Sequence, residues 1–307
     1  MGDEERSGCG ASRRCTAATL PCYQSFKVCV WIIIWDWDMA LKTEMSDKVC
    51  KRLRAATCSD QRTELLLSLN EGKKSVGDLR EALQVDGPTI IHALRMLQTI
   101  HFVSEDGERV YYLTAIGKNM VRKLIDLIGD TEVIVEHEKF WIEHDLSGIP
   151  DQLFDRIGAL RDSTLVADTK RDPLTAYHSF VAFLEKSPTV ELIASVYAPD
   201  PRFLYDEFVV GHKHIELVVT ESVLHHVIEE LGQVRVNEAL RAGDKLYVLR
   251  HDPRLVFAVA DHVIVLMLCR LGGGFDYSAA LTNESPDAIA WGHDLFRHYV
   301  DLSESVV

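Results

Sequence analysis

The sequence lacks the paired cysteine motifs that build zinc sites and redox centres. It holds seven cysteines, none of them in a Cys-x-x-Cys spacing, and the odd number occurs without a credible signal peptide. This pattern is typical of free thiols in a reducing compartment. We therefore expect a cytoplasmic protein.

Long apolar runs are also missing. The apolar run within residues 26–39 ends before Asp36 and is about ten residues long, whereas a helix needs about 20 residues to cross a bilayer. No small-residue cleavage site follows it. We predict no membrane partner and interpret residues 1–45 as a non-native or disordered extension, translated upstream of the true start. The alternative is a hydrophobic anchor to a partner protein.

Positive charge is scarce, and what there is lies unevenly. Of the formal net charge of −14, residues 1–45 contribute −1, residues 46–123 contribute +3 and residues 124–307 contribute −16. A mildly basic module joined to a strongly acidic one permits a polyanion partner for the first module only. We expect domains at 46–123 and 151–307, with a linker or dimerisation helix and a hinge over 124–150.

Three short helices are predicted in the basic module. The first follows a capping candidate at Ser59, and the second follows Ser75, with Asp78 three residues further on as in a capping box. The third is the stretch DGPTIIHALRMLQ at residues 86–98, where Asp86 is a cap candidate and Pro88 sits in the first turn.

A hairpin is predicted directly after these helices. The stretch FVSEDGERVYYLT at residues 102–114 places two β-prone runs around Asp106 and Gly107. Three helices and a hairpin in this order predict a winged helix-turn-helix of the α+β class, a fold that inserts its third helix into the major groove of double-stranded DNA.

The third helix has two faces at about 100° per residue. Its apolar face holds Ile90, Ala93, Leu94 and Leu97. The residues predicted to contact DNA lie opposite or beside that face, on the wing and on neighbouring helices: Thr89, Ile91, His92, Arg95, Thr99, Arg109, Lys73, Lys74, Arg80, Lys118 and Arg122. The alternative is a polar face that is merely solvated.

A long amphipathic helix is predicted from Thr114 onward. Its apolar residues recur at close to coiled-coil spacing, at Ile116, Met120, Leu124, Leu127 and Ile134. Either this seam packs on the first helix of the module, or it pairs with a second copy. Two-fold DNA readers commonly dimerise, so a homodimer is expected.

The acidic half alternates apolar runs with helical patterns. Strands are predicted at residues 190–195, 215–220, 245–250, 255–260 and 263–271, and helices at 172–186, 221–231 and 285–299. Fully apolar strands are typical of a sheet that is covered on both faces. The fold class expected is therefore α/β overall, a winged helix-turn-helix followed by an α/β layered-sheet domain.

Catalytic signatures are absent from this half. It has no Gly-x-Ser-x-Gly elbow, no phosphate-binding loop and no Cys-His-rich metal motif. His212 and His214 share a strand face but need a further ligand to hold a metal. We predict no enzyme activity, no cofactor and no metal. The domain is instead expected to sense a small-molecule effector and to signal through a hinge at Gly148 to Pro150.

Two other functions compete with a DNA-binding regulator. The acidic half could form a hydrolase or nuclease-like enzyme, or the chain could be an interaction protein that does not bind nucleic acid.

Four stretches resemble, in order, the archaeal winged-helix transcriptional regulators of methanogens. They are TIIHALRMLQ, YYLTAIGKNM, HDLSGIPDQLFDRIGAL and AIAWGHDLFRHY. Those proteins join an ArsR-like head to a methanogenesis-regulator (Fil-type) domain. The resemblance extends from Cys58 to the C-terminus and implies regulation of methanogenesis genes. It maps the family's recognition helix onto Thr89, Ile91, His92 and Arg95, although Asp86-Gly87-Pro88 stands here where the family often has Ser and Thr.

Overall fold

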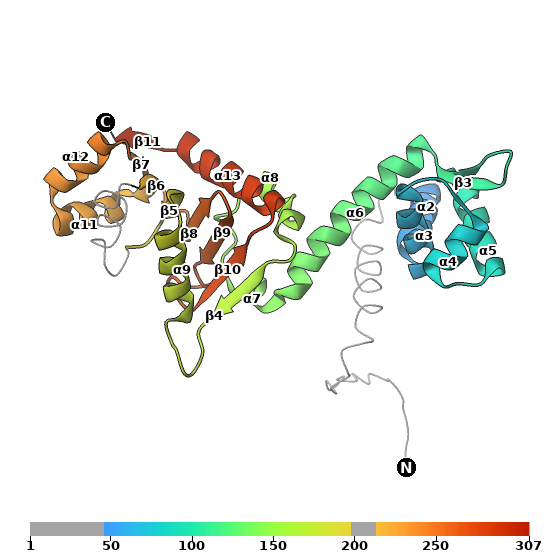
Figure 1. Cartoon of the computed structure of the whole chain (residues 1–307), viewed down its shortest axis with the longest axis horizontal. Helices are drawn as coiled ribbons and strands as arrows, with labels where there is room; N and C mark the ends of the chain where they lie inside the picture. Colours follow the sequence, from blue (N-terminus) through green and yellow to red (C-terminus); the bar gives the residue numbers. More distant parts are fainter. Residues whose placement is uncertain (1–45, 198–212, 307) are drawn as a thin grey trace, which may run out of the picture. The chain divides into compact units, whose positions relative to one another are not determined.

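The computed structural model describes residues 46–197 and 213–306. These residues form two compact units that divide between Gly117 and Lys118 (Figure 1). We describe each unit by itself. The extension expected over residues 1–45 and the histidine at position 212 both lie outside the described residues.

The first unit is a winged helix-turn-helix. Its predicted helices and strands occur in the predicted order, and two elements are additional: a helix before the first predicted helix and a short strand before the second. The elements are α2 (Asp47–Thr57), α3 (Asp60–Asn70), β1 (Lys74–Ser75), α4 (Val76–Leu83), α5 (Gly87–Thr99), β2 (Val103–Glu105) and β3 (Val110–Leu113). The three strands form an antiparallel sheet in the order β1, β3, β2.

Local capping explains where these helices begin. At α4 the Ser75 hydroxyl accepts from the backbone N–H of Asp78, and the Asp78 carboxylate accepts from the backbone of Ser75, which completes the predicted capping box. At α5 the Asp86 carboxylate accepts from the Thr89 N–H at 2.8 Å. Ser59 precedes α3 but makes no such side-chain bond.

The turn of the hairpin is organised by Asp106. Its Oδ1 accepts from the backbone N–H groups of Glu108, at 3.1 Å, and Val110, at 3.0 Å. These bonds, together with charged Lys73 nearby, hold the pKa of the Asp106 carboxyl below its usual value although burial opposes them. These bonds therefore stabilise the turn at the tip of the wing.

Helix α6 (Ala115–Glu136) begins where predicted, and the Thr114 hydroxyl caps it by accepting from the Gly117 N–H at 3.0 Å. Gly117 is required there, because a Cβ would lie 2.0 Å from the carbonyl oxygen of Phe102. A short helix α7 (Glu138–Glu143) follows. It is fastened to the end of α6 by Trp141, whose indole N–H donates to the carbonyl oxygen of Val133 at 2.9 Å.

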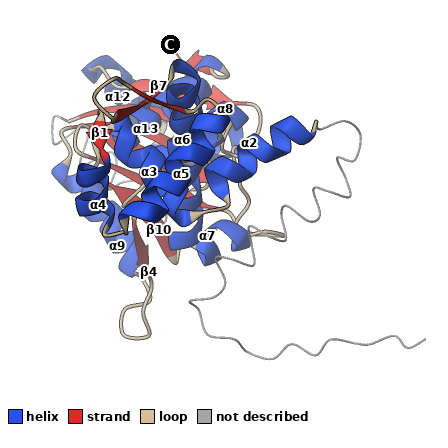
Figure 2. Ribbon diagram, turned by 90° about the vertical axis from the view of Figure 1, so that its right-hand side faces the viewer, coloured by secondary structure: helices blue, strands red, loops and turns tan. Residues whose placement is uncertain are grey.

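The second unit is built on a mixed eight-stranded sheet (red in Figure 2). The strand order is β11, β7, β6, β5, β8, β9, β10, β4, and the neighbours β5, β6 and β7 are parallel while the other pairs are antiparallel. The strands are β4 (Thr164–Ala167), β5 (Thr189–Ala194), β6 (His214–Thr220), β7 (Lys245–Leu249), β8 (Leu255–Ala260), β9 (Val263–Leu268), β10 (Ala279–Asn283) and β11 (Glu304–Val306).

Helices cover both faces of this sheet, as the apolar strands predict. On one face, α13 (Pro286–Asp301), the short α8 (Asp151–Phe154) and the 3-10 turn η1 (Ile157–Leu160) pack on alternate strand residues such as Ile193. On the other, α9 (Thr175–Lys186) and α11 (Glu221–Leu231) pack on the intervening residues. Helix α12 (Gln233–Ala242) packs beside α11. All six residues of β8 are buried, so the fold class is α/β.

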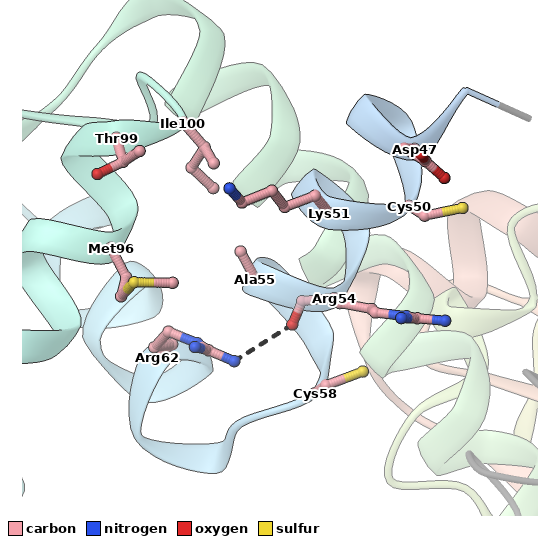
Figure 3. A pocket seen from close by; sticks show the side chains of 10 residues that line it. All are labelled: Asp47, Cys50, Lys51, Arg54, Ala55, Cys58, Arg62, Met96, Thr99 and Ile100. Atoms are coloured by element: carbon pink, nitrogen blue, oxygen red, sulfur yellow. Dashed lines mark hydrogen bonds between the residues drawn. The ribbon is translucent and has the colours of Figure 1, made fainter.

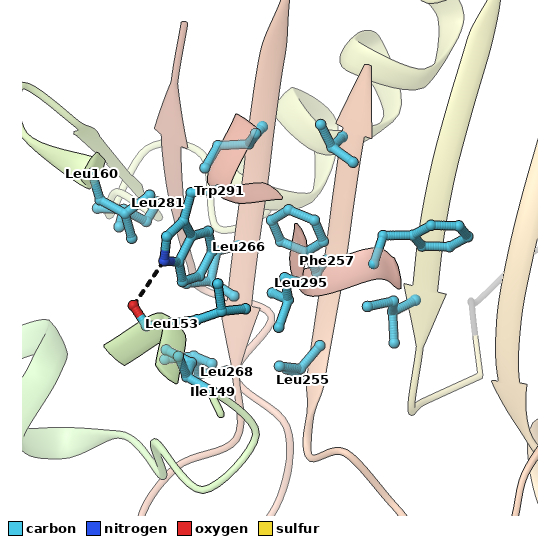
Figure 4. Close-up of a cluster of buried hydrophobic side chains, with 14 of the residues drawn as sticks. Ile149, Leu153, Leu160, Leu255, Phe257, Leu266, Leu268, Leu281, Trp291 and Leu295 are labelled. Carbon is cyan, nitrogen blue, oxygen red and sulfur yellow. Dashed lines mark hydrogen bonds between the residues drawn. The ribbon is translucent and has the colours of Figure 1, made fainter. Parts of the chain in front are cut away.

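Trp291 of α13 centres the first of these two cores. It is 1% exposed, packs among leucines from the strands, and donates its indole N–H to the carbonyl oxygen of Leu153 at 2.9 Å (Figure 4). This bond gives the indole N–H a hydrogen-bond partner within an otherwise apolar environment.

The segment from His144 to Pro150 differs from the flexible hinge that its glycine and proline predict. The Tyr299 hydroxyl donates to the carbonyl oxygen of Gly148 at 2.6 Å. A Cβ at Gly148 would lie 2.1 Å from the carbonyl oxygen of Pro253, and Ile149 is 4% exposed. Glycine serves here for close packing of backbone rather than for freedom of rotation, so the segment belongs to the core of the α/β unit.

Candidate nucleic-acid interface

Helix α5 has one buried face, as its sequence predicts. Ile90, Ala93, Leu94 and Leu97 are all 5% exposed or less. They join the core of the first unit and fix the rotation of the helix about its axis. The remaining residues of α5 are consequently presented outward.

The outward face carries the predicted recognition residues. His92, Arg95 and Thr99 are exposed, whereas Thr89 and Ile91 are partly buried. The two threonine hydroxyls are already engaged: Thr89 donates to the Asp86 carboxylate at 3.0 Å, and Thr99 donates to the carbonyl oxygen of Arg95 at 2.8 Å. Each can still accept a hydrogen bond.

Arg95 and Arg109 are brought together around one tyrosine. Tyr111 of β3 is 9% exposed, and its phenol pKa is raised by burial first and by the nearby Glu105 second. The charges of Arg109 and Arg95 act in the opposite direction on the same phenol. Helix α5 and the wing therefore each place one arginine near Tyr111.

The two predicted lysines before α4 are not equally available. Lys73 is 62% exposed, pairs with Asp106 at 3.5 Å and lies 5.1 Å from the centre of the Tyr112 ring, beside the wing. Lys74 is only 20% exposed, and its ammonium lies 2.6 Å from the Glu71 carboxylate. A phosphate contact from Lys74 would have to compete with that ion pair.

Arg80, Lys118 and Arg122 are exposed. Arg80 lies in the last turn of α4, and its Cδ is 3.6 Å from the position that a Cβ on Gly87 would occupy. Lys118 and Arg122 are four residues apart on α6 and share a helix face. Within residues 46–197 and 213–306, none of these three cations has a carboxylate oxygen within 4 Å.

The same unit contains a pocket that the sequence analysis did not predict. It has a volume of about 640 Å³ and lies between α2, α3 and the C-terminal end of α5 (Figure 3). Of the residues that line it, only Thr99 is a predicted site residue. The others come from three separate helices, and no local pattern connects them.

Among residues 46–197 and 213–306, no group of three histidine, cysteine or acidic side chains could hold a metal ion. Cys50, Cys58 and Cys269 are free thiols. No helix in these ranges has the length and apolar character needed to cross a membrane.

The fold defines the class of protein: a winged helix-turn-helix unit joined to an α/β unit. Two family models match this chain. They describe the N-terminal domain of methanogenesis regulatory protein FilR1, matched at residues 50–131, and its middle domain, matched at residues 173–302. Together they cover more than half of the sequence, so the chain belongs to the FilR1 family of methanogenesis regulatory proteins. The matches do not specify an ArsR-like type of head.

A curated relative agrees with the family. The methanogenesis regulatory protein FilR1 of Methanothrix harundinacea (strain 6Ac) is 26% identical over 262 residues, which are 83% of this chain and 58% of the relative. The chain thus spans well under two thirds of that protein's length.

Similarity to solved structures is weak over the whole chain. An archaeal chromatin protein, TrmBL2, is 13% identical, with 85% of this chain and 100% of that chain covered and a TM-score of 0.37. HmgR of Pseudomonas aeruginosa is 15% identical, with coverages of 80% and 96% and a TM-score of 0.24. Scores this low carry no argument about function.

Proposed function

We propose that this protein is a sequence-specific DNA-binding transcriptional regulator of methanogenesis-related genes. The observation that carries the proposal is the division of α5 into a buried apolar face and an exposed face with His92, Arg95 and Thr99. In a winged helix-turn-helix the third helix enters the major groove, and the wing follows the backbone. Membership of a family of regulatory proteins supports this reading over a hydrolase or nuclease.

The side chains have different roles in this proposal. Arg95 reads a base edge, because a guanidinium can donate two parallel hydrogen bonds to guanine. His92, Thr89, Ile91 and Thr99 complete the contact surface of the helix. The phosphate contacts come from the exposed cations around it: Arg80, Arg109, Lys73, Lys118 and Arg122, with Lys74 a lesser contributor because it pairs with Glu71.

The protein acts as a homodimer in this proposal. Leu127 and Ile134 of α6 are seven residues apart, and they are 56% and 37% exposed. That spacing is the repeat of a coiled-coil seam. Leu124, which the sequence places on the same seam, is 7% exposed and already packed within its own chain, so only part of the seam is free for a second copy. The α/β unit would then set the geometry of two heads in response to a small-molecule effector.

The test is DNA binding by the full chain. Duplexes are first selected from a random pool, and affinity for the selected sequence is then measured by fluorescence anisotropy. Arg95→Ala should weaken specific binding by about 1 to 3 kcal/mol, the value of one bidentate base contact. Lys118→Gln should weaken all sequences alike and lower the slope of log K against log salt by about 1.

The matched control is Arg241→Ala, an exposed arginine in the last turn of α12. It should leave affinity unchanged. Equal losses in the Arg95 and Arg241 variants, or selection that enriches no sequence, would contradict the proposal.

A further inference from the structure

The pocket of the first unit is built from three helices. Lys51, Arg54, Cys50, Asp47, Ala55 and Cys58 come from α2 or its end, Arg62 comes from α3, and Met96, Thr99 and Ile100 come from the end of α5. Its lining holds three cations and a single carboxylate. The pocket is therefore electropositive.

Two of the cations face the interior of the pocket. Figure 3 shows the Lys51 side chain reaching toward Ile100 and the Arg62 guanidinium lying below Ala55, whereas Arg54 points away from them. Lys51 is exposed and Arg62 is partly buried. In the described ranges of the chain, neither has a carboxylate oxygen within 4 Å.

The Arg62 guanidinium is only partly satisfied by the protein. One terminal nitrogen, Nη2, donates to the carbonyl oxygen of Arg54 at 3.3 Å. Its Nε is shielded from solvent and has no hydrogen-bond partner. A buried donor without a partner costs free energy. Because Nε is shielded from solvent, an acceptor in the pocket would bond to the terminal nitrogens of the same guanidinium.

Part of the pocket wall is apolar. Ala55 and Ile100 are 5% and 6% exposed, and Met96 is partly buried beside them. A volume of about 640 Å³ lies within the range of small-molecule sites and is far larger than an inorganic anion needs. The chemistry of the pocket is thus a pair of cations beside an apolar surface.

We propose that this pocket binds a small organic anion, a carboxylate or phosphate group carried on an apolar body. The anionic group lies between Lys51 and Arg62, where it accepts from the guanidinium, and the apolar body covers Ala55, Met96 and Ile100. The proposed site lies in the winged helix-turn-helix unit, whereas the sequence analysis predicted an effector site in the acidic half.

Binding is tested on the full chain by isothermal titration calorimetry with three probes. Octanoate has both parts of the proposed ligand, inorganic phosphate has only the anion, and 1-octanol has only the apolar chain. Octanoate should bind most tightly of the three. Lys51→Gln and Arg62→Gln should each weaken octanoate binding about fivefold or more, because each removes a charged partner of the carboxylate.

Lys48→Gln is the matched control for Lys51→Gln. Both are exposed lysines on α2, and Lys48 does not line the pocket. The control should bind octanoate as the wild type does. Because Lys51 is exposed, its variant keeps the fold even if Arg62→Gln, which loses the bond to Arg54, does not.

Three results would overturn the proposal. The first is no octanoate binding in the millimolar range, and the second is equal binding by the Lys51 and Lys48 variants. The third is octanol or phosphate binding as tightly as octanoate. These titrations contain no DNA, so they are independent of the proposed function.

A further measurement rests on the proposed function. Met96 and Thr99 belong to α5, so a ligand that contacts them should change the DNA affinity measured by anisotropy, and DNA must change octanoate affinity by the same factor. If Lys51→Gln weakened DNA binding and left octanoate binding intact, these cations would belong to the DNA-contacting surface and the pocket proposal would be wrong.

Discussion

Replacing Asp276 by alanine should strongly destabilise the α/β unit, because Asp276 joins three segments in its core. The carboxylate is 6% exposed. Its Oδ2 accepts from His144 Nε2 at 3.1 Å and from Arg270 Nε at 2.9 Å. Its Oδ1 accepts from the backbone N–H of Ser278 at 2.9 Å and from the Ser278 hydroxyl at 2.5 Å. All four donors would lose this acceptor in Asp276→Ala.

His144 makes the loss severe. It is 4% exposed, and its Nδ1 lies 2.7 Å from the carbonyl oxygen of Phe140. Both ring nitrogens therefore lie against oxygen atoms, and the Asp276 carboxylate is one of these two partners. Removing one partner of a buried ion pair costs about 3 to 5 kcal/mol. In a unit of this size the midpoint of thermal unfolding should fall by roughly 6 to 20 °C.

The pH dependence follows from the carboxyl group. Burial raises the pKa of Asp276, but the hydrogen bonds from Ser278, His144 and Arg270 outweigh it, so the pKa lies below its usual value. A depressed carboxyl pKa contributes stability that is present above the unfolded-state value of about 3.9 and is lost as pH falls below it. The difference between wild type and Asp276→Ala should accordingly be full at pH 7 and shrink below about pH 4.

The assay is thermal unfolding by calorimetry and circular dichroism across this pH range. Asp294→Ala is the control, since Asp294 is 38% exposed and pairs with Arg156 and Arg297 at the surface. Exposed pairs contribute about 0 to 1 kcal/mol. If Asp276→Ala cost no more than Asp294→Ala at pH 7, the buried network would have no role in stability and this reasoning would fail.

Two further predictions concern single side chains in either unit. Leu94→Ala should cost about 2 to 5 kcal/mol of stability because Leu94 is fully buried, whereas Arg95→Ala should unfold at nearly the wild-type temperature; similar losses in both would contradict the assigned faces of α5. Tyr299→Phe should cost about 0.5 to 1.5 kcal/mol by removing the bond to the Gly148 carbonyl. Burial, with a smaller effect of Asp252, raises the pKa of Tyr299 to about 12. A raised phenol pKa gives stability that is present below about pH 10 and lost as pH rises toward 12, so wild type should lose stability across that window more steeply than Tyr299→Phe, and parallel curves would refute the assignment.

Helices α3, α4 and α5 and the wing could be predicted because their sequence signals are local, whereas helix α2 was not predicted. Capping at Ser75 and Asp86, the apolar spacing of α5 and the Asp106-Gly107 turn each lie within a few residues, and the structure contains all of them. The helical-wheel projection that places Leu94 on the buried face of α5 also places Arg95 on the exposed face, as observed. The buried and exposed faces of α5 could therefore be assigned from the sequence alone.

The architecture of the sheet could be predicted only in part. Strands β5 to β9 follow from apolar runs, but β4, β10 and β11 were missed because they are short and partly polar. The strand order places β5 between β6 and β8, so it depends on pairings between distant residues. The hydrophobic pattern predicts which face of a strand is buried. It does not predict which strands are neighbours in the sheet.

The pocket could not be predicted from the sequence, because it also depends on contacts between distant residues. Lys51 and Arg62 are separated by a turn between two helices, and Met96 lies on a third. Each residue alone resembles an ordinary surface or core side chain. Only tertiary packing places the two cations beside an apolar wall and leaves Arg62 Nε without an acceptor.

The close packing around Gly148 concerns the segment through which the α/β unit is joined to α6. Residues 144–150 are held by Tyr299, Asp276 and the backbone of Cys269, which accepts from the Asp145 N–H at 2.8 Å. These bonds attach the loop to the core of the α/β unit. Helix α7 continues directly into this loop and is tied to α6 by Trp141, and α6 runs without a break across the division between the units. Under the proposed function, an effector bound to the α/β unit would be connected to the DNA-binding unit through α6, whereas an anion in the pocket of the first unit would contact α5 itself.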